Sequence, residues 1–393
     1  MTLSAAVGIA LLGCAAVRST DERPVDIREL PVDIDALRSG TLLFEEPVDS
    51  SEVSDVNILG LDDAMRHFIA TEVANAPNPR ARMGRLLHGM RELGYFDVVY
   101  DAELTLSAAE AFHSKAGNCL AYTNMFIALA REAGLDARYQ IVAVPPTWDL
   151  AEDLVIRSNH INVLVRGVRL DVSRLHEFVV DFNQVAPDGE FETHIVSDAE
   201  ALALFYMNLS VEHLKQGEDR KTFAYLMKAI ETDPNNADFW VNLGVVHSRR
   251  DHLDGALQAY TLALELDPKN KSAVAGLAAV YAELGQVALA LHFEAKVRGY
   301  REANPYFHFA HAREAYDGQR YKESLRAINV ALRKQPRTGA FYFMKALAQL
   351  QLENPAGARR SLERAERYGR YKDLLRRYGA DLTRLTEQWV SVR

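Results

Sequence analysis

Hydrophobic residues recur at helical spacing from about residue 60 onward, and this periodicity predicts a run of helices. The segment 61–74 places its apolar side chains on one helical face, and the segment 80–93 repeats the pattern and ends before Gly94. Ser107 and Glu110 have the spacing of a capping box, in which each side chain bonds the backbone N–H of the other residue. A third helix is therefore expected to begin near residue 107.

Strands are predicted after one further helix. The break at 117–118 precedes an apolar helix that begins at Cys119. Beyond this helix, three short runs rich in β-branched and aromatic residues have the composition of strands, and they cover 139–145, 161–165 and 178–180. Residues 60–200 are therefore expected to combine helices with strands in one domain.

The second half of the chain carries a repeat of 34 residues. Three prolines are separated by 34 and 68 residues, and three asparagines follow the same period. These residues are Pro234, Pro268, Pro336, Asn236, Asn270 and Asn304. A period of this length is typical of an array of helical hairpins, each of which buries its apolar face against its neighbours.

One unit of this array closely resembles a tetratricopeptide repeat. Trp240, Leu243 and Gly244 match the first helix of that motif, and Ala256 and Tyr260 match the second. The resemblance implies an all-α solenoid that follows the mixed domain. Its five units are expected at 203–236, 237–270, 271–304, 305–338 and 339–372, with a capping helix at 373–393.

The mixed domain contains residues suited to catalysis by a thiol. Cys119 stands at the start of a helix, where the helix dipole is expected to lower the pKa of its thiol. His160 opens a later strand and can act as the base, and a carboxylate farther along can orient its imidazole. Asp181 and Asp171 are both candidates for that carboxylate, and the alternation of the strands does not separate them.

This order of residues resembles the transglutaminase-like superfamily, most clearly at 117–119 and 127–142. The resemblance implies an α+β papain-type domain in which Cys119 is the nucleophile and His160 the base. It favours Asp181 as the orienting acid, because the superfamily has an apolar strand that ends in Asp. The match departs from the superfamily at 161–162, where Ile-Asn stands in place of the usual Ala-Trp.

The implied reaction is acyl transfer on an amide. Bacterial members of the superfamily are implied to be mostly peptidases or amidases, so hydrolysis ranks above crosslinking. The expected reaction needs no cofactor and no metal ion, and no phosphate-binding loop or dinucleotide fingerprint occurs in the sequence.

The N-terminus has the pattern of an exported lipoprotein. A short apolar run ends in Leu11-Leu12-Gly13-Cys14, which resembles a bacterial lipobox, although no Lys or Arg precedes the run. The resemblance implies that residues 1–18 hold the signal and a lipid-bearing Cys14, and that the protein is attached to a membrane of the bacterial envelope. The outer membrane, facing the periplasm, is the expected location. An ordinary N-terminal segment is the alternative.

Charge is distributed unevenly along the 393 residues. The net charge of -9 argues against a nucleic-acid partner. Residues 19–63 hold thirteen acidic side chains against three basic ones, and three prolines interrupt the same stretch. We therefore expect residues 19–59 to be an acidic spacer with little structure of its own.

A tetratricopeptide array implies a protein or peptide partner on the concave face that its first helices form. The residues that the resemblance places there are Met207, Val211, Val241, Val245, Arg249, Tyr306, Phe309, Arg313, Tyr316, Phe343 and Leu347. Aromatic side chains with two arginines suit an extended acidic or apolar segment. The alternative is that some of them pack against neighbouring helices instead.

Two functions follow from these patterns. The first is an envelope lipoprotein with a cysteine hydrolase domain and a repeat array that holds a partner. The second is a catalytically inactive scaffold lipoprotein that mediates contacts between proteins. Reactivity of Cys119 separates the two.

Overall fold

The structure is a computed structural model that describes residues 33–44, 46–95, 99–101, 104–151, 154–169, 175–182 and 192–368. The chain forms two compact units. The first comprises Leu30–Thr147 and Ser158–Asn270, and the second comprises Met1–Glu29, Trp148–Arg157 and Lys271–Arg393. Cys14 and the predicted capping helix at 373–393 lie outside the described residues. In the described part of the chain, no helix has the length and apolar character needed to cross a bilayer.

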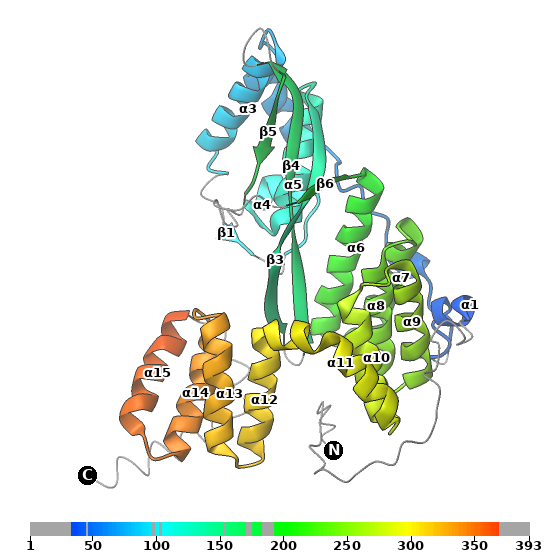
Figure 1. The fold of residues 1–393 in the computed structure, drawn as a ribbon. Helices are drawn as coiled ribbons and strands as arrows, with labels where there is room; N and C mark the ends of the chain where they lie inside the picture. The colour runs from blue at the N-terminus through cyan, green and yellow to red at the C-terminus, as the bar shows by residue number, and fades with distance from the viewer. Residues whose placement is uncertain are drawn as a thin grey trace. The chain divides into compact units, whose positions relative to one another are not determined.

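Helices form one side of the mixed region in the first unit (Figure 1). They are α2 at Asp63–Phe68, a π-helical turn at Ile69–Val73, α3 at Pro79–Glu92, α4 at Ala108–Ser114 and α5 at Cys119–Glu132. The capping box forms at the start of α4, where Glu110 accepts the Ser107 N–H at 2.9 Å. Helix α5 is the centre of this core, because every side chain from Leu120 to Ala130 is buried.

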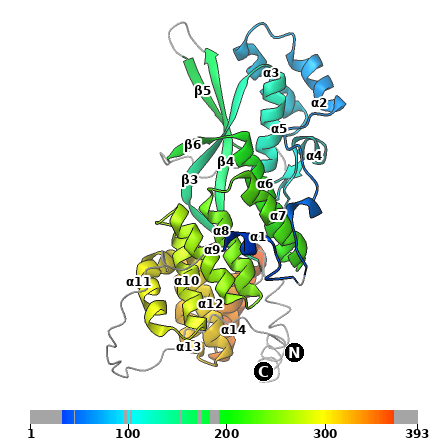
Figure 2. The ribbon, with the colours of Figure 1, turned by 90° about the vertical axis from the view of Figure 1, so that its right-hand side faces the viewer.

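Four strands form the main sheet in the order β5-β4-β3-β6 (Figure 2). They are β3 at Asp136–Ala151, β4 at Leu154–Arg169, β5 at Leu175–Val180 and β6 at Thr193–Val196. Strands β4 and β5 are antiparallel, with Val163 opposite Val180, and a bulge interrupts their register between Val165 and Val168. Strand β6 pairs antiparallel with β3. Two short parallel strands, β1 at Val99–Tyr100 and β2 at Ala116–Gly117, form a separate pair.

The strands β3 and β4 are longer than the runs predicted from composition, and β6 was not predicted. Strand β3 continues through two consecutive prolines at 145–146, residues that ordinarily end a strand. Strand β6 buries only one side chain, that of Val196. A strand of this kind does not show the alternation of apolar and polar residues from which strands are predicted.

Two helical hairpins complete the first unit. They consist of α6 at Asp198–Lys215 with α7 at Asp219–Thr232, and of α8 at Ala237–Arg249 with α9 at Leu253–Leu266. Asn236 caps α8 by accepting the Asp238 N–H at 3.2 Å, which explains the periodic asparagine. Gly244 is required because a Cβ there would lie 2.5 Å from the Tyr260 ring of α9.

Three further hairpins form the second unit. They are α10 at Lys271–Glu283 with α11 at Val287–Ala303, α12 at Pro305–Asp317 with α13 at Tyr321–Lys334, and α14 at Gly339–Gln351 with α15 at Pro355–Tyr368. The last two of these hairpins share a hydrophobic core that is rich in aromatic side chains from α12 and α14. The Phe309 and Phe341 rings pack there with centroids 5.1 Å apart.

Several residues that we expected on a partner-binding face lie inside the protein. Tyr306, Phe309 and Tyr316 are buried in the core that α12 shares with α13 and α14, so they pack between helices. Val241 on α8 is buried as well. The first helix of each hairpin therefore turns its largest apolar side chains toward neighbouring helices.

Phe343 and Leu347 on α14 are fully buried, and Met207 on α6 is buried too, so only four of the predicted groove residues, Val211 among them, keep contact with solvent. Val245 and Arg313 are half-buried, and Arg249 is exposed. The Arg313 guanidinium lies 5.9 Å from the centre of the Phe309 ring, which holds part of this side chain against the core. Their role in partner binding stays a prediction.

Residues 33–44 and 46–56 form a strap over α7 and α9, which we call the N-terminal strap. It contains α1 at Ile34–Arg38 and a 3₁₀ turn at Ser50–Glu52. Leu37 and Val48 in the strap are fully buried. The expectation that this stretch has little structure of its own was therefore wrong for these residues. Its scattered apolar side chains pack against the repeats.

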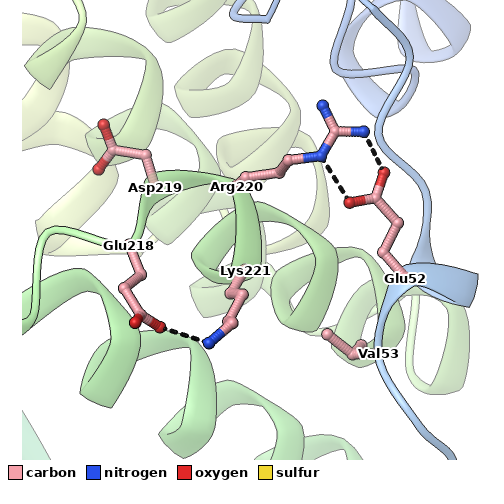
Figure 3. Close-up of a pocket in the computed structure, with 6 residues that line it drawn as sticks. All are labelled: Glu52, Val53, Glu218, Asp219, Arg220 and Lys221. Atoms are coloured by element: carbon pink, nitrogen blue, oxygen red, sulfur yellow. Dashed lines mark hydrogen bonds and ion pairs between the residues drawn. The ribbon is translucent and has the colours of Figure 1, made fainter.

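Ion pairs fix the strap to α7. Arg220 donates two hydrogen bonds to Glu52, at 2.5 and 2.7 Å, and Figure 3 shows these two side chains facing each other. Lys228 donates to the Val53 carbonyl at 2.8 Å. The Phe44 ring meets the Phe223 ring edge-on, with centroids 5.7 Å apart. Apolar burial holds the strap more strongly than the exposed ion pairs, each of which is worth at most about 1 kcal/mol.

Candidate active site

The loop before α5 places Cys119 at the first position of that helix. Gly117 has φ of +152°, and a Cβ at this position would lie 2.8 Å from the Ala121 side chain. Asn118 caps the helix, because its Oδ1 accepts the Ala121 N–H at 3.0 Å. The Asn118 amide also donates to Thr105 Oγ1 at 2.8 Å, so both ends of this side chain are fixed.

The preceding loop is fastened to the repeats as well as to α5. Glu212 on α6 accepts the Thr105 N–H at 3.1 Å. Deeper in the core, Asn124 of α5 accepts the Tyr139 hydroxyl proton at 2.6 Å and donates to the Leu106 carbonyl at 3.2 Å. These bonds fix the Cys119 end of α5 relative to β3 and α6.

His160 and Asp181 lie together beside that helix. The His160 Nε2 and Asp181 Oδ2 atoms are 2.6 Å apart, and the His160 side chain is only 5% exposed. The antiparallel register brings them together, because Val163 opposite Val180 places Asp181 level with Asn162, two residues after His160 on β4. With an ionised carboxylate, Nε2 carries the proton, and Nδ1 is left as the basic nitrogen.

Phe182 positions the segment that carries Asp181. Its ring stacks on Tyr122 of α5 with centroids 5.5 Å apart, and it meets Phe126 edge-on at 6.0 Å. Sequence reasoning did not single out Phe182, although its place directly after a candidate acid at the end of an apolar strand is a usable signal.

The Cys119 thiol lies next to the backbone of the residue that follows His160. Burial raises the pKa of the Cys119 thiol, and hydrogen bonds to the sulfur from the Ile161 and Leu120 N–H groups act in the opposite direction. The charge of Asp181 raises the pKa further, which also shows that this carboxylate is close. We expected the helix N-terminus to lower this pKa. Burial outweighs it, because the thiolate would lose its hydration.

The resting site therefore holds a protonated thiol. A thiol of this kind needs a base at the moment of attack. The structure brings Cys119, His160 and Asp181 into one neighbourhood. Asp171 lies outside the described residues, so its position relative to His160 is not given.

Asn162 is a further polar residue of this region. It lies two positions after His160 and hence on the same face of β4, and it is 4% exposed. Its Oδ1 atom has no hydrogen-bond partner among the described residues. The superfamily usually has Trp at this position, so a polar amide side chain replaces an aromatic one here.

Comparisons with known proteins agree with this architecture. The model of the transglutaminase-like superfamily matches residues 68–174, and two models of the tetratricopeptide repeat match residues 225–258 and 309–372. The chain joins a transglutaminase-like domain to tetratricopeptide repeats. The predicted fold class, an α+β domain followed by an all-α repeat solenoid, is thereby confirmed.

MamA and YrrB are among the solved structures to which part of this chain is similar. MamA from Desulfovibrio magneticus RS-1 is 16% identical, with a TM-score of 0.28, and the match covers 44% of this chain and 96% of that chain. YrrB, described as a tetratricopeptide protein with an unusual peptide-binding site, is 20% identical, with a TM-score of 0.25 over 42% of this chain and 86% of that chain. A search of curated proteins finds no match.

Proposed function

We propose that the transglutaminase-like domain is a cysteine hydrolase that cleaves amide bonds, as a peptidase or amidase. The observation that carries this proposal is the 2.6 Å contact between His160 Nε2 and Asp181 Oδ2 beside the Cys119 thiol. A buried imidazole fixed by a carboxylate is the arrangement that a protonated thiol requires.

In the proposed reaction, the Cys119 sulfur attacks the amide carbonyl carbon while His160 Nδ1 takes the thiol proton. The oxygen of the tetrahedral intermediate accepts the backbone N–H of Cys119. The C–N bond then breaks, and His160 returns the proton to the leaving amine. Water attacks the thioester next, with His160 as base, and releases the acid and the thiol. Asp181 holds the imidazole in the required tautomer throughout.

We further propose that the repeats hold a protein or peptide partner and that Cys14 carries a lipid. Val211 and Val245, which are half-buried, and exposed Arg249 are the predicted groove residues of the first unit that are still available to a partner. The anchor rests on the sequence at Leu11–Cys14.

Exchange of Cys14 for serine tests the anchor. One sulfur would be both the lipid attachment point and the processing signal, so Cys14→Ser is expected to move the protein from the membrane fraction to the soluble fraction. Equal membrane association and equal N-terminal mass for both proteins argue against lipidation.

A scaffold without catalysis is the second candidate. The raised pKa of the buried Cys119 thiol favours it, because a thiol of this kind is unreactive unless a base assists it. The same buried helix start would then serve packing alone.

Product analysis on a defined peptide mixture tests hydrolysis. Wild type is expected to produce new peptide termini or Glu from Gln, and Cys119→Ala to produce neither, because no other nucleophile replaces the sulfur. A fluorescent primary amine added to the mixture reports crosslinking, since its covalent incorporation would mean amine transfer in place of hydrolysis. Absence of every product, together with an unreactive Cys119, favours the scaffold.

A further inference from the structure

The last hairpin of the second unit carries a pocket whose charged residues all have the same sign. It is lined by Lys345, Gln349, Gly357, Arg360, Ser361 and Arg364, from α14 and α15. Three of these side chains are cationic and none is acidic. Because like charges repel, such a lining is costly unless an anion accompanies it.

These cations have no acidic partner in the described part of the chain. Arg359 on α15 pairs with Glu363 at 3.4 Å. Lys345, Arg360 and Arg364 form no ion pair with any described residue. The Arg364 guanidinium lies instead over the Tyr342 ring, 5.4 Å from its centre. Lys345 is half-buried, and burial, followed by the charge of Arg364, lowers the pKa of its ammonium group. An anion in the pocket would stabilise the charged form of Lys345 against both its burial and the charge of Arg364.

Neutral donors in the pocket are fixed as well. Ser361 donates to Gln349 Oε1 at 2.7 Å, and both side chains are more than nine-tenths buried. This bond assigns Gln349 Nε2 as a donor on the pocket side, where it would lie 2.8 Å from a Cβ at Gly357. The glycine therefore leaves room beside the amide.

We propose that this pocket binds a carboxylate of an acidic peptide segment. Two arginines on one face of α15 and a lysine from α14 match the oxygens of a carboxylate, with Gln349 as an additional donor. Phosphate sites commonly use free backbone N–H groups at a helix start, but here the Gly357 N–H already donates to Asn354 Oδ1 at 2.9 Å. The proposal rests on peptide binding by the repeats and is independent of hydrolysis at Cys119.

Fluorescence anisotropy of a labelled hexaglutamate peptide with the full chain tests the proposal. Arg360→Gln/Arg364→Gln is expected to weaken binding about tenfold or more, since two charge-assisted contacts are lost. Arg359→Gln/Arg367→Gln is the matched control, because it removes the same charge from the same helix outside the pocket lining, and it is expected to change the affinity less than about twofold. Equal losses in both variants would mean a general basic surface and overturn the pocket.

Lys345→Met separates a binding role from a structural one. It is expected to weaken hexaglutamate binding and at the same time to raise the melting temperature, because a half-buried unpaired charge is replaced by an apolar side chain of similar length. A fall in both quantities would mean that Lys345 supports the fold and would overturn its assignment to the pocket.

Three further probes identify the anion. Hexaglutamine is expected not to bind, and inorganic phosphate and phosphatidylglycerol vesicles are expected to compete only weakly with hexaglutamate. Stronger binding of phosphate or of vesicles overturns the carboxylate assignment. If an unbiased peptide library binds wild type and the pocket variants equally, the assignment of this pocket is overturned, whereas the proposal that the repeats bind peptides is not.

Discussion

Replacement of His160 by alanine should slow the alkylation of Cys119 by iodoacetamide at neutral pH about tenfold or more. The raised pKa of the buried thiol leaves little thiolate in the resting protein, so wild type depends on His160 for proton removal. The wild-type rate should fall on acidification, because fewer Cys119 thiols are then deprotonated. In His160→Ala, the rate should rise only at high pH, as the unassisted thiol ionises. Mass spectrometry of the Cys119 peptide measures both profiles.

Two aspartate variants complete this experiment. Asp181→Asn should slow alkylation less than His160→Ala, because it changes the orientation and the tautomer of the imidazole but leaves the base in place. Asp171→Asn should leave the rate unchanged if Asp181 is the orienting acid. Circular dichroism must first show that each variant is folded. Equal slow rates for folded wild type and folded His160→Ala across the pH range would rule out catalysis by this site.

Replacement of Trp240 by alanine should destabilise the repeats of the first unit by about 3–5 kcal/mol. The Trp240 side chain is buried in α8, and its indole N–H donates to the Pro234 carbonyl at 2.9 Å. The variant therefore loses apolar burial, leaves a cavity and loses the hydrogen bond to the Pro234 carbonyl. Hydrogen exchange of the peptides that cover α7, α8 and α9 measures this loss locally, without assuming that the whole chain unfolds in one step.

Trp240→Phe is the matched control for this prediction. It keeps most of the apolar volume and removes only the hydrogen bond to Pro234, so a loss of about 1 kcal/mol is expected. A loss below about 1 kcal/mol in Trp240→Ala would contradict a packed role for the indole. If α14 and α15, which belong to the other unit, exchange faster to the same extent as α8, the effect is global and the local assignment is wrong.

The repeats could be predicted well because each periodic residue has one physical reason. Asn236 and Asn304 cap helices α8 and α12, and Gly244 makes room for the Tyr260 ring. Such requirements recur with each hairpin and therefore appear in the sequence at fixed spacing. The His160–Asp181 pair was also within reach, because the strand that follows a catalytic base commonly carries its orienting acid.

Other features could not be read from spacing. Tyr306 and Phe309 have the position of groove residues in a repeat, but burial between α12 and α14 depends on which way each helix is rotated. The pKa of Cys119 depends on the balance between burial and backbone hydrogen bonds, and only the packed structure sets that balance. The N-terminal strap was missed because its apolar residues follow neither a helical nor a strand period.

The strap limits how far a lipid on Cys14 would let the first unit move from a membrane. Eighteen residues lie between Cys14 and Asp33, whose backbone N–H donates to Gln258 of α9 at 3.0 Å. Fully extended, this length reaches roughly 65 Å, whereas a free spacer up to residue 60 would reach roughly 160 Å. The volume that the domain can explore grows with the cube of that radius, so the docked strap reduces it more than tenfold. Substrates would then have to lie within a shallow layer above the lipid.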